Sequence, residues 1–185
     1  INEGAFINCP NLTEILVAMG NTSFYSGDYG ELYNTLNQLV CFPTAGTGDN
    51  GYVEMRPGTS LAITYAFAYT KNIFNVKLAA SVTSIPDYTF TESSLRRIEI
   101  PVGVSSIGAS AFAKCTSLES VVLPERLTKV YDSSFEGCSS LTSVTFNQNL
   151  RYIGRYAFQR CNLKTVELKE NVEEIRENAF ANMTN

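Results

Sequence analysis

The chain has 185 residues, of which 44% are hydrophobic and 17% are charged, so it is too apolar for a disordered segment. Its 18 acidic residues outnumber its 14 basic ones, and the resulting net charge of -4 argues against a nucleic-acid partner. Histidine is absent, which removes the commonest general base and metal ligand, and no apolar run approaches the roughly 18 residues of a transmembrane segment.

A motif near the start of the chain returns later. Residues 4–17 read GAFINCPNLTEILV, in which Cys9 and Leu12 follow Phe6 by three and six places. The next match to this motif begins at Phe67, 61 residues after Phe6, where one period of the later repeat would be about 23. Residues 18–51 are therefore predicted to interrupt the repeat.

This interruption carries its own structural signals. Alternating aromatic and aliphatic residues around glycines, as in SFYSGDYGELYN, predict short antiparallel strands joined by turns. Four of its aromatic side chains are of the kind that interfaces favour, and they are candidate partner-binding residues: Phe24, Tyr25, Tyr29 and Tyr33. The alternative is a solvated cap over the end of a stack of repeats, and residues 1–66 do hold six acids and one base.

Regular repeats of 22–23 residues occupy about residues 52–185. Each is marked by a phenylalanine: Phe67, Phe90, Phe112, Phe135, Phe158 and Phe180. Leu-x-x-Val-x-Leu motifs, from IFNVKL to LKTVEL, predict short strands with one face inward. A turn, a second extended pair such as Leu127 and Val130, and a short helical turn such as SAFAKC would complete each coil. The predicted fold is an α/β solenoid of right-handed coils, with a parallel sheet, short helical turns and a β-hairpin insertion.

The string AFxxCxxLxxVxLPxxLxxI resembles the BspA-like, or Treponema pallidum-type, family of leucine-rich repeats. The similarity covers residues 64–185 closely and residues 4–17 again, with Thr70 and Ser93 where the family pattern has cysteine. The resemblance implies one leucine-rich repeat domain over residues 1–185 in a secreted or cell-surface bacterial protein. It also implies binding to host proteins or other cells and no catalytic residues. Since both ends fall inside a repeat, we expect the chain to be part of a longer protein.

Four of the five cysteines lie three residues after a repeat phenylalanine and are expected to form a ladder of buried thiols: Cys9, Cys115, Cys138 and Cys161. In-register neighbours would hold their Cβ atoms about 4.8 Å apart with parallel vectors, whereas a relaxed disulfide needs about 3.8 Å. No C-x₂₋₄-C spacing typical of zinc occurs. We therefore predict reduced thiols in the ladder, while Cys41 stands apart from this pattern.

Other catalytic and cofactor patterns are weak. Residues 46–51 read GTGDNG and match G-x-G-x-x-G, but the strand pattern YVEM follows where a dinucleotide site needs a helix. A serine triad needs histidine, which is missing. The sequence thus predicts no cofactor, no metal site and no enzyme.

The strand residues that flank the inward positions point out of the sheet and form two polar columns. One column is Asn75, Arg97, Ser120, Ser143 and Thr165, and the other is Lys77, Glu99, Val122, Thr145 and Glu167. Seven of them are candidate partner-binding residues: Asn75, Lys77, Arg97, Glu99, Val122, Thr145 and Glu167. The alternative for each of these positions is a merely solvated face.

Three functions remain in competition. The first is a non-catalytic module that binds a host or cell-surface protein through the sheet face or the insertion. The second is a passive spacer that carries no ligand of its own, which the lack of aromatic residues in the columns favours. An enzyme is the third, and the residues that it would need are missing. The oligomeric state is not addressed by any of these patterns.

Overall fold

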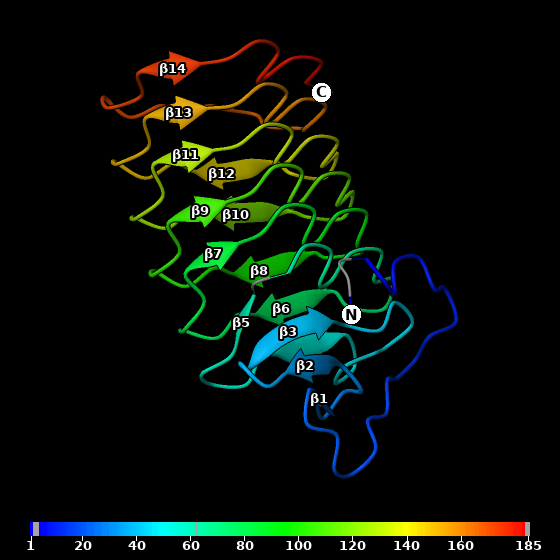
Figure 1. The fold of residues 1–185 in the computed structure, drawn as a ribbon. Coiled ribbons are helices and arrows are strands. Elements are labelled where there is room, and N and C mark those ends of the chain that lie inside the picture. The colour runs from blue at the N-terminus through cyan, green and yellow to red at the C-terminus, as the bar shows by residue number, and fades with distance from the viewer. Residues whose placement is uncertain (2–3, 62, 184–185) are drawn as a thin grey trace.

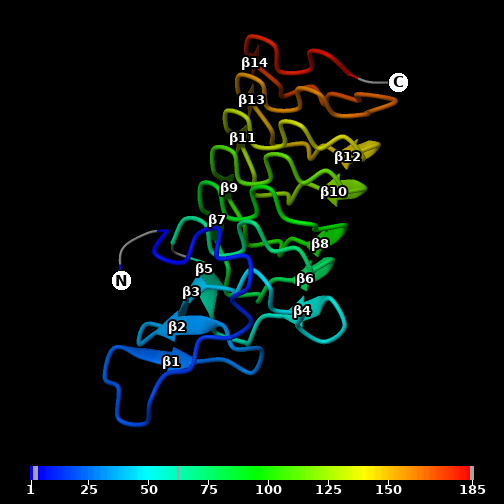
Figure 2. The same ribbon diagram turned by 90° about the vertical axis from the view of Figure 1, so that its right-hand side faces the viewer.

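The computed structural model describes residues 1, 4–61 and 63–183, and it is a solenoid whose coils stack along one axis (Figure 1). Each regular coil contributes a first and a second short strand, which face each other across the core (Figure 2). The chain belongs to the predicted solenoid class, and its parallel strands follow the 22–23-residue period.

The first row contains five three-residue strands in successive coils: β4 (Tyr52–Glu54), β6 (Asn75–Lys77), β8 (Arg97–Glu99), β10 (Ser120–Val122) and β12 (Ser143–Thr145). Strands β4, β6 and β8 form one parallel sheet, and β10 and β12 form another. The central residue of each strand faces the core, as Val53, Val76 and Val121 do at 3% exposure each. The flanking residues of each strand therefore face outward.

The second row contains five two-residue strands in one parallel sheet: β7 (Ser84–Ile85), β9 (Ser106–Ile107), β11 (Lys129–Val130), β13 (Tyr152–Ile153) and β14 (Glu174–Ile175). The second residue of each strand from β7 to β13 is buried. The expected strand LKTVEL is not formed at residues 163–168. This coil has a first-row neighbour on one side only, so Val166 and Leu168 remain 36% and 39% exposed.

The N-terminal end of the stack is covered by a four-stranded sheet. Its strands are β1 (Phe24–Ser26), β2 (Leu32–Asn34), β3 (Gln38–Cys41) and β5 (Ser60–Leu61). The pairing is antiparallel from β1 through β3, as the sequence pattern of the interruption predicts. It is parallel between β3 and β5. Within the predicted interruption, Gln38 and Leu39 of β3 therefore pair in parallel with Ser60 and Leu61 of β5, as the strands of neighbouring coils do.

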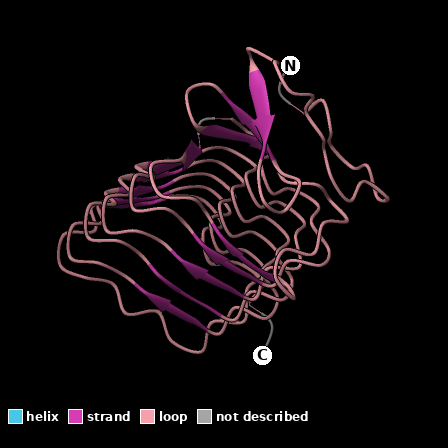
Figure 3. Cartoon of the chain, turned by 90° about the horizontal axis from the view of Figure 1, so that it is seen from below, coloured by secondary structure: helices cyan, strands magenta, loops and turns pink. Residues whose placement is uncertain are grey.

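A column of stacked phenylalanine rings runs through the core. Successive centroids lie 5.0 to 5.4 Å apart, and the members are Phe42, Phe67, Phe90, Phe112, Phe135, Phe158 and Phe180. Phe42 extends the column by one coil beyond the phenylalanines identified from spacing. Phe6 lies outside the column, packed against a separate cluster of Leu32, Val40 and Cys41. Its segment runs along the outside of the coils (Figure 3).

The prediction of short helical turns is wrong, because the described residues contain no helix. The residues two before and two after Phe112, Ser110 and Lys114, have positive φ angles of 54° and 57°. A left-handed residue on each side of the phenylalanine prevents a continuous α-helix. The backbone instead bonds between coils: the Phe112 N–H donates to the Ser134 carbonyl at 2.8 Å. Equivalent bonds recur along the column.

Three cysteines follow the column as a ladder of fully buried, free thiols: Cys115, Cys138 and Cys161. Each thiol donates to the phenylalanine carbonyl of the preceding coil at 3.0 to 3.1 Å. Cys9 does not join them. Its segment lies at the flank, where the Thr44 hydroxyl donates to the Cys9 carbonyl, so the expected four-membered ladder has three members.

Candidate functional site

The first-row strands present a regular outer surface, which we call the first-strand face. It consists of the two predicted columns, preceded by Tyr52 and Glu54 of β4. The register places Asn75 beside Arg97 and Lys77 beside Glu99, and it places Ser120 beside Ser143. Thr165 and Glu167 are exposed in the last coil, beyond the strands. The candidate residues of the columns are therefore brought together on one side of the stack.

The N-terminal half of this face carries charged side chains that form ion pairs within the same chain. The Lys77 ammonium lies 2.8 Å from the Glu54 carboxylate, and the Tyr52 hydroxyl donates to Glu54 at 3.4 Å. The hydrogen bond and charge of Lys77 lower the pKa of Glu54, and the same contact raises the pKa of Lys77. Arg97 reaches Glu119 at 3.4 Å. These exposed pairs leave few charges free for a partner.

The C-terminal half of the face is uncharged around an exposed aliphatic side chain. Val122 is 66% exposed and pairs with Thr145 of β12, with Ser120 and Ser143 beside it and Glu99 in the preceding coil. On its N-terminal side, an open hollow of about 440 Å³ extends from Val122 back to Tyr52 and is lined by the charged residues Lys77, Arg97 and Glu99. A second hollow, of about 320 Å³, lies over β12. The face is thus shallow and broad, which suits a macromolecular surface better than an enclosed small molecule.

A lysine–glutamate pair borders the second hollow. The Lys169 ammonium lies 2.6 Å from the Glu167 carboxylate, and this hydrogen bond lowers the pKa of Glu167. The pairing joins two residues of the last coil and resembles that of Glu54 and Lys77 at the other end of the face. The uncharged surface around Val122 is therefore bounded by Glu99 on one side and by the Glu167–Lys169 pair on the other.

The four aromatic candidates of the interruption pack mainly inward. Tyr33 is only 2% exposed, and its ring stacks on Tyr25 with centroids 5.3 Å apart. Burial, followed by the neighbouring Glu31, raises the pKa of Tyr33. Phe24 packs against the cluster that contains Val40. Tyr29 is also partly buried against the main core, and Tyr33 is the least exposed of the four aromatic candidates.

Sequence reasoning missed the role of Glu31, which is 3% exposed in this cap. Its carboxylate accepts the Tyr29 N–H at 2.8 Å. A Cβ atom at Gly27 would lie 1.9 Å from a Glu31 oxygen, so a side chain there would have to displace the Glu31 carboxylate. The available signal was the spacing of GDYGE, in which the acid follows the first glycine by four places. The hydrogen bond within this turn accounts for the burial of the Glu31 carboxylate.

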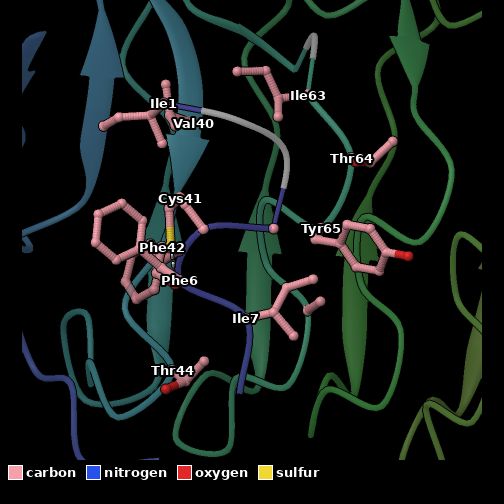
Figure 4. A pocket seen from close by; sticks show the side chains of 13 residues that line it. Ile1, Phe6, Ile7, Val40, Cys41, Phe42, Thr44, Ile63, Thr64 and Tyr65 are labelled. Carbon is pink, nitrogen blue, oxygen red and sulfur yellow. Dashed lines mark hydrogen bonds between the residues drawn. The ribbon is translucent and has the colours of Figure 1, made fainter. Parts of the chain in front are cut away.

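A small enclosed pocket lies between the N-terminal segment and β3 (Figure 4). Its accessible volume is about 10 Å³, and its lining includes Phe6, Val40, Cys41 and Ile63. This space is about the size of one water molecule and is lined mainly by apolar side chains. A pocket of this size is too small for an organic substrate.

The glycine motif at residues 46–51 forms a turn before β4. A Cβ atom at Gly51 would meet the Phe74 ring at 2.4 Å, and one at Gly48 would meet the Tyr52 carbonyl oxygen at 2.4 Å. Both glycines also have positive φ angles. Close packing therefore accounts for them, and no helix follows to receive a phosphate.

The described residues form neither a metal-binding group nor a membrane-spanning helix. No group of three or more Cys, Asp or Glu side chains among them is arranged to hold a metal ion. Within the same residues, no helix has the length and apolarity needed to cross a bilayer.

A family model matches most of the repeats. The model is described as the BspA type leucine-rich repeat region, and six copies of it match residues 63–185. No protein with a curated description matches the chain.

Solved structures of bacterial leucine-rich repeat proteins match over most of this chain. A leucine-rich repeat protein from Eubacterium ventriosum is 27% identical with a TM-score of 0.77, covering 98% of this chain and 55% of its own. A leucine-rich cell surface protein from Faecalibacterium prausnitzii is 26% identical with a TM-score of 0.72, covering 86% and 42%. The pneumococcal vaccine antigen PcpA, 20% identical with a TM-score of 0.69 and coverage of 86% and 44%, shares the fold. The chain spans about half the length of these proteins.

Proposed function

Because this chain belongs to the BspA-type leucine-rich repeat family, we propose that it is a non-catalytic protein-interaction module of a secreted or cell-surface bacterial protein. Leucine-rich repeats generally mediate protein interaction and are generally non-catalytic. The similar Faecalibacterium prausnitzii protein is a cell surface protein, which supports this location. Adhesion to host proteins or to other cells is the form of binding that we propose.

The observation that carries this proposal is the uncharged centre of the first-strand face. Val122 is 66% exposed, although the equivalent flanking positions in the other coils are polar. Removal of such an aliphatic side chain from water stabilises a complex by roughly 1.5–3 kcal/mol when burial is complete. The serine and threonine neighbours offer hydrogen bonds with little side-chain entropy to lose. We place the binding site around Val122, with Asn75, Lys77, Arg97, Glu99, Thr145 and Glu167 at its borders.

The competing function is the passive spacer, and one observation favours it. The Glu54–Lys77 and Arg97–Glu119 pairs neutralise charges within the same molecule, as expected of a merely solvated surface. A spacer would tolerate any soluble substitution on this face.

The experiment compares two exposed valines. Val122→Glu places a charge at the centre of the face, whereas Val102→Glu changes a valine that is 82% exposed in the turn after β8. The purified chain is offered immobilised plasma and extracellular-matrix proteins from a host, and captured amounts are measured by surface plasmon resonance. We expect Val122→Glu to weaken capture about tenfold or more, because the charge loses its water on binding. Val102→Glu should not change it. Equal capture by both variants would remove the face from the proposal, and no capture by the unmodified chain would favour the spacer.

A further inference from the structure

The outer side of the second row of strands carries a groove on a different surface from the first-strand face. It consists of two open hollows of about 570 and 460 Å³ that follow one another along the stack. The first lies over β7 and β9, and the second lies over β11, β13 and β14. Tyr131 lines both hollows. We call this surface the second-strand groove, and its main residues are Ser84, Asp87, Ser106, Tyr131, Asp132 and Tyr152.

The Tyr131 side chain stands free between the two hollows. The residue is 42% exposed, and its hydroxyl has no hydrogen-bond partner in the described part of the chain. Its predecessor, Val130, pairs in register with the residues that precede Gly108 and Gly154 in the two neighbouring coils. Neither glycine has a side chain that could cover the ring. The Tyr131 ring is therefore open to a ligand from either hollow.

Two carboxylates beside this ring are held in place by the backbone. Asp87 accepts the Ala109 N–H at 2.8 Å through Oδ1, and Asp132 accepts the Arg155 N–H at the same distance. The second oxygen of each carboxylate has no partner among the residues described. A fixed carboxylate oxygen is a strong acceptor for a hydroxyl donor, and little entropy is lost because it is already oriented.

The floor of the groove adds hydroxyl groups and an ordered aromatic ring. Ser84 and Ser106 are register partners on neighbouring strands, and their hydroxyls have no partner within the described ranges. The Tyr152 ring is contacted by Arg176 at 5.2 Å and by the Lys129 ammonium at 6.0 Å. These groups present donors and acceptors at the strand spacing of about 4.8 Å.

We propose that the second-strand groove binds a neutral oligosaccharide, with one sugar ring stacked on Tyr131. The face of an aromatic ring is negative, so it attracts the polarised C–H groups of a sugar face. The sugar hydroxyls can donate to Asp87 and Asp132 and accept from the serines. The charges that line the groove are mixed, with Asp87, Asp132 and Glu174 beside Lys129 and Arg176, so they give an acidic polymer no advantage over a neutral one. A peptide anchor would need an apolar, enclosed pocket, which this open polar groove does not provide.

The test uses isothermal titration calorimetry with four probes: maltohexaose, cellohexaose, mannohexaose and chitohexaose. We expect at least one of them to bind the unmodified chain at millimolar or lower concentration. Tyr131→Ala should weaken that binding about tenfold or more, whereas Tyr131→Phe keeps the ring and should retain it. The matched control is Tyr88→Ala, which removes a tyrosine that is 37% exposed and does not line either hollow. This control should bind as the unmodified chain does.

A second variant covers the case in which Tyr131→Ala fails to fold. Ser106→Arg fills the first hollow and leaves Tyr131 in place, so it should also abolish binding while circular dichroism shows an intact fold. Failure of all four sugars to bind at millimolar concentration would overturn the proposal, as would binding that survives both Tyr131→Ala and Ser106→Arg. Binding of a decaproline peptide in place of the sugars would overturn it in favour of a peptide site. None of these outcomes bears on the protein-binding role of the first-strand face.

Discussion

The Cys138 thiol donates a hydrogen bond to the carbonyl oxygen of Phe112, 3.1 Å away in the preceding coil. The same carbonyl accepts the Cys115 N–H within its own coil at 3.1 Å. Cysteine suits this position because it is small and apolar and still carries a weak donor. In the earlier coils, Ser93 contacts Cys115 at 3.4 Å and Thr70 bonds the Phe67 carbonyl at 2.9 Å. From Phe67 to Phe158, the third position after each repeat phenylalanine is thus occupied by a small side chain that can donate a hydrogen bond.

Thiol reactivity should distinguish Cys9 from the other four cysteines. Cys9 is partly exposed, whereas Cys41, Cys115, Cys138 and Cys161 are buried. Burial raises the pKa of Cys41 and of Cys115 to about 12, which leaves almost no reactive thiolate at neutral pH. We expect an aromatic disulfide reagent to label one thiol in the folded chain and five after unfolding in guanidinium. Mass spectrometry identifies the labelled residue, and rapid labelling of Cys138 in the native state would contradict the buried ladder.

Alkaline pH should destabilise the fold through the same thiols. The ordinary thiol pKa of 9.0 rises to about 12 in folded Cys115, so the folded state retains a proton that the unfolded state releases. The stabilisation is therefore complete below about pH 9 and is lost as the pH rises toward 12. One such thiol lowers the free energy of unfolding by about 1.4 kcal/mol per pH unit within this window. Urea melts at pH 8 and pH 10 measure the slope, and Cys115→Ala should reduce it while Cys41 maintains the remainder. An unchanged slope would contradict the raised pKa.

Removal of one ring from the phenylalanine column should create a cavity in the centre of the stack. Phe135 is fully buried, and its ring lies 5.0 Å from Phe112 and 5.2 Å from Phe158. We expect Phe135→Ala to lower the free energy of unfolding by about 3–5 kcal/mol. The control is Val102→Ala at an exposed turn, which should change it by less than about 0.5 kcal/mol. A loss below about 1 kcal/mol for Phe135→Ala in chemical denaturation would mean that the column is not continuous.

Close approach of neighbouring coils should make Gly154 intolerant of a side chain. A Cβ atom there would lie 2.5 Å from Asp132 Oδ1 and 2.7 Å from backbone atoms of the preceding coil. Since backbone cannot move away as a flexible side chain can, we expect Gly154→Ala to lower the free energy of unfolding by about 1–3 kcal/mol. At Gly103 the nearest atom would be 3.8 Å away, so Gly103→Ala is the matched control. Equal thermal stability of the two variants would contradict the close approach.

Much of the fold could be predicted because its physical cause is periodic. The spacing from Phe67 to Phe180 reports residues that must meet in one column, and the structure confirms both that column and the two rows of strands. The turn around each phenylalanine could not be predicted in the same way. A sequence such as SAFAKC has helical propensity, but the turn is decided by hydrogen bonds to the next coil, as at Ser134. The local sequence pattern does not indicate these hydrogen bonds between coils.

The N-terminal end was harder to predict because similarity and position disagree there. Phe6 keeps the cysteine and leucine spacing of a repeat but packs outside the column. Phe42 has alanine at the position where the motif has cysteine, yet its ring stacks on Phe67 at 5.3 Å. Phe42 joins the column because strand β3, which precedes it, pairs with β5 and so aligns Phe42 with Phe67 of the next coil. This pairing depends on tertiary structure.

The candidate surface could be predicted in part. Side-chain alternation placed Asn75, Lys77 and Val122 on one side, where the structure also has them. The pairing of charges depends on how neighbouring coils align, and strand alternation does not reveal it. The aromatic residues of the interruption illustrate the opposite difficulty: composition favours an interface, but tertiary packing buries Tyr33. Composition cannot distinguish a cap from a binding surface.

The most direct measurement of the proposed function is site-specific photo-crosslinking. A benzoylphenylalanine is incorporated at Val122 on the first-strand face or at Val102 in the exposed turn, and each chain is irradiated with a host protein that the unmodified chain captures. The account predicts a covalent complex from position 122 and none from position 102, because only the former would lie inside the interface. Efficient crosslinking from position 102 with none from position 122 would contradict the assignment of the first-strand face as the binding surface.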